Sequence, residues 1–225
     1  MKRFAITGYG PANEVFQEIT VPSREVTSKH LRVKLKAFSI NPYDVALRLG
    51  KMQEVRQLKF PYVLGDDGAG VVTEVASDVT HFHVGDQVVV HPISGAYGEE
   101  FVLPVSKVAK IPDGMSWAEA ASMVTTGITA YNVIHHLLTI QPTDTVMVEG
   151  ASGGVGTILI QLLHQKGIRV LASASKKMKK WYENWVSRIF LPMIKKIQVK
   201  NLKIRRILLL TQQKAVLKEK QVFKS

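Results

Sequence analysis

The first 110 residues show the alternation of apolar and polar side chains that is typical of half-buried β-strands. Residues 32–40 read Arg-Val-Lys-Leu-Lys-Ala-Phe-Ser-Ile, and residues 70–75 and 86–90 predict two further strands. Glycine, proline and aspartate separate these runs, and the pair Asn41-Pro42 is one such break. Several short strands at close spacing indicate a compact, barrel-like β domain.

The pattern becomes helical after Ser116. Ser116 and Glu119 have the spacing of a capping box, in which each side chain accepts a hydrogen bond from a backbone N–H at the start of a helix. This spacing predicts a helix that begins after Ser116 and continues through Met123. A second helix is expected over residues 129–138.

Residues 145–173 follow the order strand, glycine loop, helix, strand. Residues 145–148 are a short apolar run suited to a buried strand, and residues 155–164 are amphipathic. Gly167 is placed to end that helix, and residues 169–173 predict the second strand. This is one βαβ unit, the beginning of a parallel, doubly wound sheet.

The glycine loop of this unit reads Gly150-Ala-Ser-Gly-Gly-Val-Gly156. Glycines permit a tight turn and let backbone N–H groups approach a pyrophosphate, while the following helix supplies partial positive charge at its N-terminus. The flanking strand and helix favour dinucleotide binding, and a glycine turn kept only for packing is the alternative. The strict fingerprint is altered, because Ala151 stands at its first glycine position.

The end of the second predicted strand bears on the choice of nicotinamide cofactor. Residues 173–177 read Ser-Ala-Ser-Lys-Lys and contain no acid. An acidic side chain there would bind the ribose 2′-hydroxyl of NAD, whereas hydroxyl and cationic groups suit the 2′-phosphate of NADP. We therefore predict NADP(H), with an ordinary solvated lysine pair as the alternative.

Composition divides the chain at residue 176. Residues 1–175 hold 15 Lys and Arg against 16 Asp and Glu, whereas residues 176–225 hold 15 against two, so the net charge of +12 comes from the last 50 residues. The absence of cysteine excludes a disulfide scaffold, a thiolate zinc site and a Cys nucleophile. No segment reads as a signal peptide or a membrane span, so a cytoplasmic protein is expected.

Several collinear motifs together resemble the medium-chain dehydrogenase/reductase superfamily, in its zinc-free, quinone oxidoreductase-like branch. The motifs are Ser39-Ile-Asn-Pro-Tyr-Asp44 with Arg48 and Gly50, Pro61 to Val72, Val84 to Val89, Ala96 to Phe101, Gly127 to Ala130, and Gly150 to Gly156. The resemblance implies an α/β fold with a GroES-like catalytic domain over residues 1–124. It implies the start of a Rossmann domain, with its doubly wound parallel sheet, over residues 125–175, followed by an atypical basic tail over residues 176–225.

The resemblance also implies an oxidoreductase that uses NADPH to reduce a quinone or an α,β-unsaturated carbonyl. Asn41 and Thr129 resemble positions that contact the nicotinamide end, and Ser175 and Lys176 resemble contacts of the 2′-phosphate. The cofactor contacts implied for the pyrophosphate loop are Ser152, Gly153, Gly154 and Val155.

Tyr43 and Arg48 are the candidate catalytic residues, because the resemblance places both near the substrate cleft. Tyr43 could donate a hydrogen bond to the substrate carbonyl as it gains charge, and a buried structural tyrosine is the alternative. Asp44 and Asp67 are interpreted as turn or hydrogen-bonding residues. Zinc-dependent relatives place Cys before the first Asp and Gly-His-Glu later in the chain. Neither motif is present here, so no metal is predicted.

Residues 176–225 depart from the family's pattern. A basic interaction tail is one interpretation, with residues 204–210 as a cationic amphipathic helix that binds membrane or nucleic acid. The interpretation we favour is a frameshift near the codons of Lys176 and Lys177. In the alternative frame, the single codons of Met and Trp fix the order Glu-x-x-Val-x-x-Leu-Gly, which resembles the family's missing helix.

On the frameshift interpretation, the 225-residue chain is expected to be unstable or impaired, while its intact parent is an active reductase. An inactive truncated remnant, or a non-enzymatic binding protein with the same fold, is the alternative. The expected partner is a small-molecule quinone or enone, with no nucleic acid and no membrane. A homodimer is considered only for the intact parent.

Overall fold

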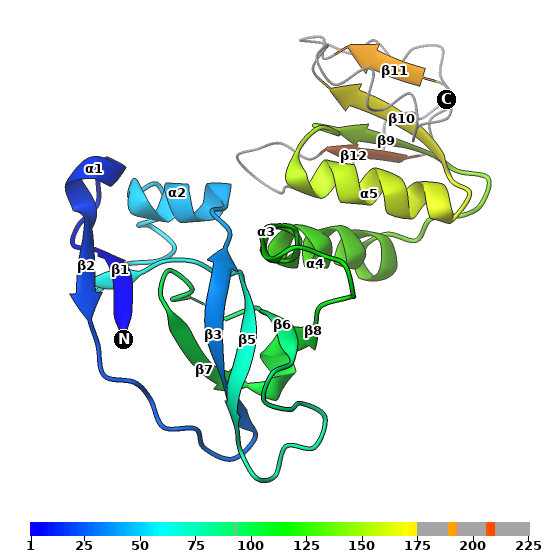
Figure 1. The fold of residues 1–225 in the computed structure, drawn as a ribbon. Helices are drawn as coiled ribbons and strands as arrows, with labels where there is room; N and C mark the ends of the chain where they lie inside the picture. Colours follow the sequence, from blue (N-terminus) through cyan, green and yellow to red (C-terminus); the bar gives the residue numbers. More distant parts are fainter. Residues whose placement is uncertain (93, 175–188, 193–205, 210–225) are drawn as a thin grey trace. The chain divides into compact units, whose positions relative to one another are not determined.

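The computed structural model describes residues 1–92, 94–174, 189–192 and 206–209. The chain divides into two compact units, Met1–Thr125 and Thr126–Ser225, which are coloured blue to green and green to red in Figure 1. Among the described residues, no helix combines the length and the apolar character needed to cross a bilayer.

The first unit is built on a five-stranded antiparallel sheet. In spatial order its strands are β7 (Glu100–Pro104), β3 (His30–Phe38), β5 (Gly68–Val75), β6 (Gln87–Val90) and β8 (Val108–Lys110). The three strands predicted from alternation are confirmed as β3, β5 and β6, with ends displaced by at most two residues. Their inward-facing side chains form a core in which every member is at most 2% exposed: Leu31, Val33, Val72, Val88, Val90 and Leu103.

A second, three-stranded sheet closes this unit at its N-terminal side. Its order is β2 (Phe16–Thr20), β1 (Lys2–Ile6) and β4 (Tyr62–Val63), with the short helix α1 (Ala12–Val15) between β1 and β2. A separate buried cluster packs beneath it, formed by Ile6, Val15, Leu47, Leu64 and Tyr97. Sequence alternation gave no signal for these strands, because β4 has only two residues and β1 and β2 are half exposed.

Helix α2 (Pro42–Arg48) begins at the position where the sequence suggested only a break between strands. The backbone N–H of Asn41 donates to the Asp44 carboxylate over 2.8 Å, and Pro42 occupies the first helical position. A proline at that position loses no helical hydrogen bond, so the same residue that ends a strand can start a helix.

Helix α3 (Trp117–Ser122) confirms the predicted capping box. The backbone N–H of Glu119 donates to Ser116 Oγ over 3.3 Å, and the Ser116 N–H donates to the Glu119 carboxylate over 2.9 Å. Met123 is the C-cap, so the helix is one residue shorter than expected. Its buried face, Ala120 and Ala121, packs on the sheet, and the short 3-10 turn η1 (Val105–Lys107) links β7 to β8.

The second predicted helix starts earlier than expected. Helix α4 spans Val124–Asn132 and continues as a π-helical turn, η2 (Val133–Leu137), so the expected start at residue 129 is five residues late. The capping signals that mark other helix starts are absent here, because α4 follows α3 almost directly.

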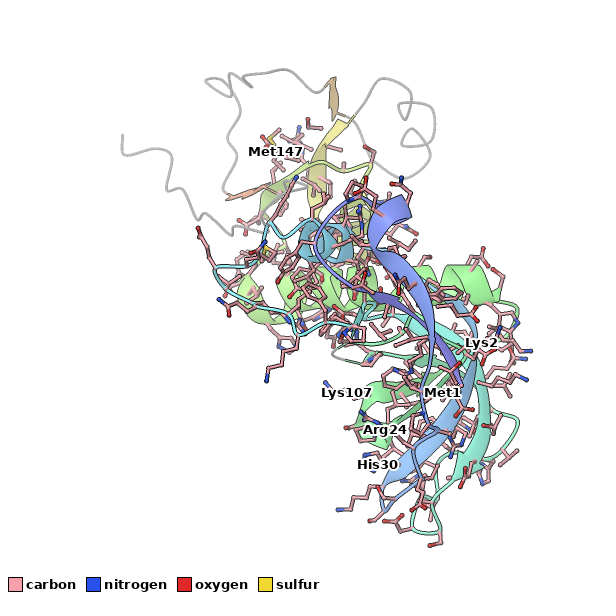
Figure 2. All side chains as sticks on the ribbon, turned by 90° about the vertical axis from the view of Figure 1, so that its left-hand side faces the viewer. Met1, Lys2, Arg24, His30, Lys107 and Met147 are labelled. Atoms are coloured by element: carbon pink, nitrogen blue, oxygen red, sulfur yellow. The ribbon has the colours of Figure 1, made fainter. Side chains whose placement is uncertain are left out.

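A four-stranded parallel sheet forms the second unit, in the order β11 (Ile189–Pro192), β10 (Arg169–Ala174), β9 (Thr145–Glu149) and β12 (Arg206–Leu209). Helix α5 (Gly154–Gln165) connects β9 to β10, which confirms the predicted βαβ unit (Figure 1). Met147 lies in the middle of β9 and is 1% exposed (Figure 2). The core of this unit comprises Ala130, Val133, Ile134, Val146, Val148, Ala151, Leu159, Ile160, Leu163, Ile168, Val170 and Ala172.

The amphipathic helix considered for residues 204–210 is wrong for the part that the structure describes. Residues Arg206–Leu209 form strand β12 and pair in parallel with β9. A short run of Ile and Leu gains backbone hydrogen bonds from pairing with a buried strand, whereas a single isolated helical turn is unstable.

Candidate functional site

The first unit holds a fully buried carboxylate, Asp67, immediately before β5. Its Oδ2 accepts hydrogen bonds from Ser39 Oγ (2.6 Å) and Asn41 Nδ2 (2.7 Å). Its Oδ1 accepts from the Thr125 backbone N–H (3.1 Å) and Oγ1 (2.5 Å), and His91 Nδ1 lies 3.5 Å away. Four hydrogen-bond donors from two separate segments of the chain therefore converge on one carboxylate, and the His91 ring from a third segment lies beside it.

Burial by itself would raise the pKa of Asp67. The hydrogen bonds from His91, Ser39, Thr125 and Asn41 outweigh that effect and lower the pKa of this carboxyl below its usual value. The pKa of His91 is raised, chiefly by its contact with Asp67, against the opposing effect of burial. The surroundings thus favour the ionised form of Asp67, and the nearby carboxylate favours the protonated form of His91.

Asn41 is oriented by this carboxylate. Its side-chain nitrogen donates to Asp67 Oδ2 and, over 3.2 Å, to Ser39 Oγ. An amide nitrogen carries two hydrogens, and both are used by these contacts. Asn41 can therefore offer a ligand only its carbonyl oxygen, as an acceptor.

Two more aspartates lie close to Asp67. Asp44 is 2% exposed and accepts from the backbone N–H groups of Asn41 (2.8 Å) and Gly65 (3.2 Å), so it is a hydrogen-bonding residue, as interpreted from the sequence. Burial raises the pKa of Asp44. Asp66 has its pKa raised to about 6, first by burial and then by the charge of Asp44.

Tyr43 and Arg48 lie on the same helix, α2, but contact different groups. The Tyr43 hydroxyl accepts a hydrogen bond from Arg56 Nη1 over 3.1 Å. The Arg48 guanidinium donates to the carbonyl of Gly10, whose N–H donates back to the Arg48 carbonyl over 3.0 Å. Arg48 thereby fastens α2 to the turn after β1, while Tyr43 joins a polar cluster.

That cluster contains two residues that the sequence analysis missed. Arg56 Nη2 donates to the Tyr62 hydroxyl over 2.6 Å, and the guanidinium carbon lies 5.7 Å from the centre of the Tyr62 ring. Arg56 stands in an irregular turn and Tyr62 in a two-residue strand, so neither belongs to a periodic pattern or a motif. No sequence signal indicated that they would meet Tyr43.

The second unit holds the glycine loop at the carboxyl end of β9. Gly150 has a φ of +69°, a left-handed conformation that favours glycine. A Cβ on Gly156 would lie 2.6 Å from the Gly150 carbonyl oxygen and 2.7 Å from that of Ala151, so only glycine lets α5 come this close to the loop. The Ala151 N–H donates to the Ser173 carbonyl of β10 over 3.0 Å, which fixes the loop between the two strands.

The predicted pyrophosphate contacts lie in this loop and at the start of α5, and Thr129 lies in α4 of the same unit. A Cβ on Gly154 would lie 2.8 Å from Thr126 Cγ2, so the start of α4 packs against the loop, and Thr129 lies one helical turn further along α4. Ser152 and Gly153 are partly exposed in the loop, and the side chain of Val155 packs against the core. Ser175 and Lys176 lie outside the described residues.

The comparisons with known proteins agree with both units. The alcohol dehydrogenase GroES-like domain family matches residues 27–113. A probable quinone oxidoreductase of Schizosaccharomyces pombe is 33% identical over 172 residues, which are 76% of this chain and 51% of that protein. Polyketide synthase GfsB of Streptomyces halstedii is 35% identical over 145 residues, 64% of this chain and 2% of the synthase.

Among solved structures, the quinone oxidoreductase of Escherichia coli complexed with NADPH matches with a TM-score of 0.77 at 25% identity. The match covers 90% of this chain and 62% of that one.

Through its GroES-like domain and its similarity to quinone oxidoreductases, the chain resembles the medium-chain dehydrogenase/reductase superfamily in its quinone oxidoreductase-like branch.

The chain has the predicted fold class, a GroES-like β-rich unit and a partial Rossmann-like parallel sheet. It spans about half the length of the quinone oxidoreductases that it matches. Among the residues that the structure describes, no three His, Asp or Glu side chains form a metal-binding group. The predicted absence of a metal, the domain boundaries and the roles of the site residues stay predictions.

Proposed function

We propose that this protein is an oxidoreductase that uses NADPH to reduce a quinone or an α,β-unsaturated carbonyl without a metal. The observation that carries the proposal is the glycine loop. Gly156 permits close contact with the carbonyl oxygens of residues 150 and 151, and α5 begins within the loop at Gly154. The first N–H groups of a helix have no acceptor within the helix, and they suit a pyrophosphate.

The choice of NADPH is supported by the cofactor bound to the Escherichia coli relative and by the absence of an acid over residues 173–177. NADPH, when bound, supplies the hydride. In this proposal, the backbone N–H groups of Ser152, Gly154 and Val155 hold the pyrophosphate, and Gly153, whose own N–H donates to the Gly150 carbonyl over 2.9 Å, shapes the loop around it. Asn41 presents its carbonyl oxygen to the amide hydrogens of the nicotinamide, because its own amide hydrogens are already used by Asp67 and Ser39.

Tyr43 is proposed as the hydrogen-bond donor to the substrate oxygen. The hydroxyl oxygen of Tyr43 accepts from Arg56, so its own hydrogen is directed elsewhere and can be donated. Charge-assisted bonding to the oxygen also polarises the O–H group, which makes it a better donor as negative charge develops on the substrate. Arg48 is a positioning residue in this proposal, because it holds α2, and with it Tyr43, against the turn at Gly10.

The proposal includes impaired turnover by the 225-residue chain, because the residues after Ser175 depart from the family's pattern. Binding and turnover therefore need separate measurements. Purified chain should be titrated with NADPH and with NADH by the fluorescence of the reduced nicotinamide. NADPH oxidation at 340 nm should then be followed with 1,4-benzoquinone and with an enone. Tighter binding of NADPH than of NADH is expected, with slow oxidation.

The matched variants for this titration are Gly156→Ala and Gly8→Ala. The first places a methyl group against two carbonyl oxygens of the loop, and the second meets no atom within 4 Å. We expect at least a tenfold loss of NADPH affinity in Gly156→Ala and unchanged affinity in Gly8→Ala. Absence of NADPH binding by a folded wild-type chain would instead identify a non-enzymatic or remnant protein.

A further inference from the structure

Three side chains from separate elements of the first unit meet at the Arg56 guanidinium. Tyr43 comes from α2, Tyr62 from β4, and Arg56 from the turn between them. Arg56 donates to the Tyr43 hydroxyl over 3.1 Å and to the Tyr62 hydroxyl over 2.6 Å. We call these three residues the Arg56 cluster.

The Arg56 cluster has more hydrogen-bond donors than acceptors. A guanidinium carries five N–H groups, and two of them are used by the tyrosines. Each tyrosine oxygen accepts from Arg56 and keeps its own hydrogen to donate. Within the described residues, no acceptor is bonded to these remaining donors, and Asp66 influences the Arg56 charge without forming an ion pair with it.

Arg32, in the same unit, is a guanidinium whose charge is balanced by bonded acids. It donates to Glu74 over 2.9 Å, to Glu100 over 2.8 Å and to the backbone carbonyl of Arg24 over 2.8 Å. Two carboxylates and a carbonyl thus satisfy it. Arg56 contacts only hydroxyl groups, so its charge is not balanced by a bonded acid.

Exposed apolar side chains lie close in sequence to each member of the cluster. Val55, which precedes Arg56, is 76% exposed, and Phe60, two residues before Tyr62, is 37% exposed. Ile40, three residues before Tyr43, is 68% exposed. The hydrocarbon part of an organic acid can bury apolar surface of this kind on binding, which a small inorganic anion cannot do.

We propose that the Arg56 cluster recognises a carboxylate on the electron acceptor, so that the substrate class is an acidic enone or quinone. The planar guanidinium matches a carboxylate in two parallel hydrogen bonds, and the tyrosine hydroxyls supply further donors. This inference rests on the proposed function for its substrate, because it refines which enone or quinone Tyr43 would meet.

The test uses 3-benzoylacrylate and its methyl ester, two enones with the same skeleton, of which the ester carries a methyl group in place of the negative charge. Their affinities for the full 225-residue chain should be measured by isothermal titration calorimetry without NADPH. The wild type is expected to bind the acid at least tenfold more tightly than the ester. Arg56→Gln should reduce this preference to less than twofold. Arg56→Lys should leave an intermediate preference, because lysine keeps the charge but lacks the two parallel N–H groups of the guanidinium.

Lys51→Gln is the matched control, since it removes an exposed positive charge from the same turn region. It is expected to keep the full preference for the acid. Tyr62→Phe keeps the guanidinium charge and removes one hydrogen-bond donor, so the preference for the acid is expected to fall two- to fivefold. This second variant reports on the cluster if Arg56→Gln fails to fold.

Equal binding of acid and ester by the wild type, or an unchanged preference in Arg56→Gln, would overturn the proposal. An equal loss in Lys51→Gln would also overturn it, because the preference would then reflect overall charge. Failure of the proposed function looks different, since it appears as an absence of NADPH binding. A chain that prefers the acid but does not bind NADPH would support this inference and contradict the function.

Discussion

The two units position their candidate functional residues by different means. In the first unit, side chains from residues 39, 41, 91 and 125 converge on one buried carboxylate, that of Asp67. In the second, seven consecutive residues form a loop whose geometry depends on backbone atoms and on the absence of Cβ atoms. The first arrangement should therefore be sensitive to the removal of a side chain, and the second to the addition of one.

Removal of the Asp67 carboxylate is expected to have the largest effect. Asp67→Ala removes the fully buried acceptor of the part-buried donors of Ser39, Asn41 and Thr125, and it removes the carboxylate that faces His91. We expect the free energy of unfolding to fall by about 3–5 kcal/mol. Urea denaturation followed by far-UV circular dichroism measures it.

Asp113→Ala is the control for this change, because Asp113 is an exposed acid of the same unit. Its free energy of unfolding should stay within about 0.5 kcal/mol of the wild type. If Asp67→Ala were equally mild, the convergence of donors on Asp67 would not stabilise the first unit, and the contrast between the units would fail.

Addition of a methyl group to the glycine loop should have the next largest effect. Gly156→Ala places a Cβ against two carbonyl oxygens at 2.6 and 2.7 Å, which are backbone atoms and cannot move independently. We expect a loss of about 1–3 kcal/mol in the free energy of unfolding. Gly127→Ala, in α4, meets no atom within 4 Å and should instead stabilise by up to about 1 kcal/mol, since alanine favours a helix. Equal destabilisation of the two variants would mean that the effect of Gly156→Ala does not come from the close contact between α5 and the loop.

The same contrast explains how much the sequence could predict. The glycine loop, its flanking strands and α5 were predicted because the signals are local: spacing of glycines, a short apolar run and a helical period. The partners of Asp67 lie up to 58 residues from it in the sequence, and no pattern in one sequence shows which loops meet. Arg56 and Tyr62 were missed for the same reason. Asn41 was placed by resemblance, but the orientation of its amide depends on Asp67 and so required the structure.

Replacement of Asp66 by asparagine should show that not every carboxylate of the first unit stabilises that unit. The pKa of Asp66 is raised to about 6 by burial and by Asp44, whereas the pKa of an aspartate in the unfolded chain is about 3.9. A raised pKa contributes stability below pH ~3.9 that is lost as the pH rises through about 6. Asp66→Asn is therefore expected to be more stable than the wild type at pH 7, by about 1 kcal/mol after solvent screening.

The check is urea denaturation at pH 3.5 and at pH 7. The advantage of Asp66→Asn should vanish at the lower pH, where Asp66 is protonated in both the folded and the unfolded state. Asp113→Asn should show no advantage at either pH, because Asp113 is exposed. A loss of stability in Asp66→Asn at pH 7 would show that the carboxylate is stabilising, and that its neighbours Arg56 and His91 outweigh its burial.

The smallest effect on stability is expected for a change at His91. Among the described partners of Asp67, His91 is the one whose side chain can change its charge near neutral pH. Its pKa is raised by Asp67, so its contribution is fully present below pH ~6.5 and is lost as the pH rises through the raised value. His91→Gln should cost about 0.5–1 kcal/mol at pH 5.5 and almost nothing at pH 9, because the imidazole is partly exposed and its ion pair is screened. Asp67 stays ionised throughout this range, since its own pKa is lowered. Asp66 also faces His91, so the same two measurements should be repeated in the Asp66→Asn variant, in which that acid is neutral. If His91→Gln lowers the free energy of unfolding by the same amount at both pH values in the Asp66→Asn variant, His91 acts through packing. The four hydrogen bonds from Ser39, Asn41 and Thr125 then hold the Asp67 carboxylate without a counter-charge.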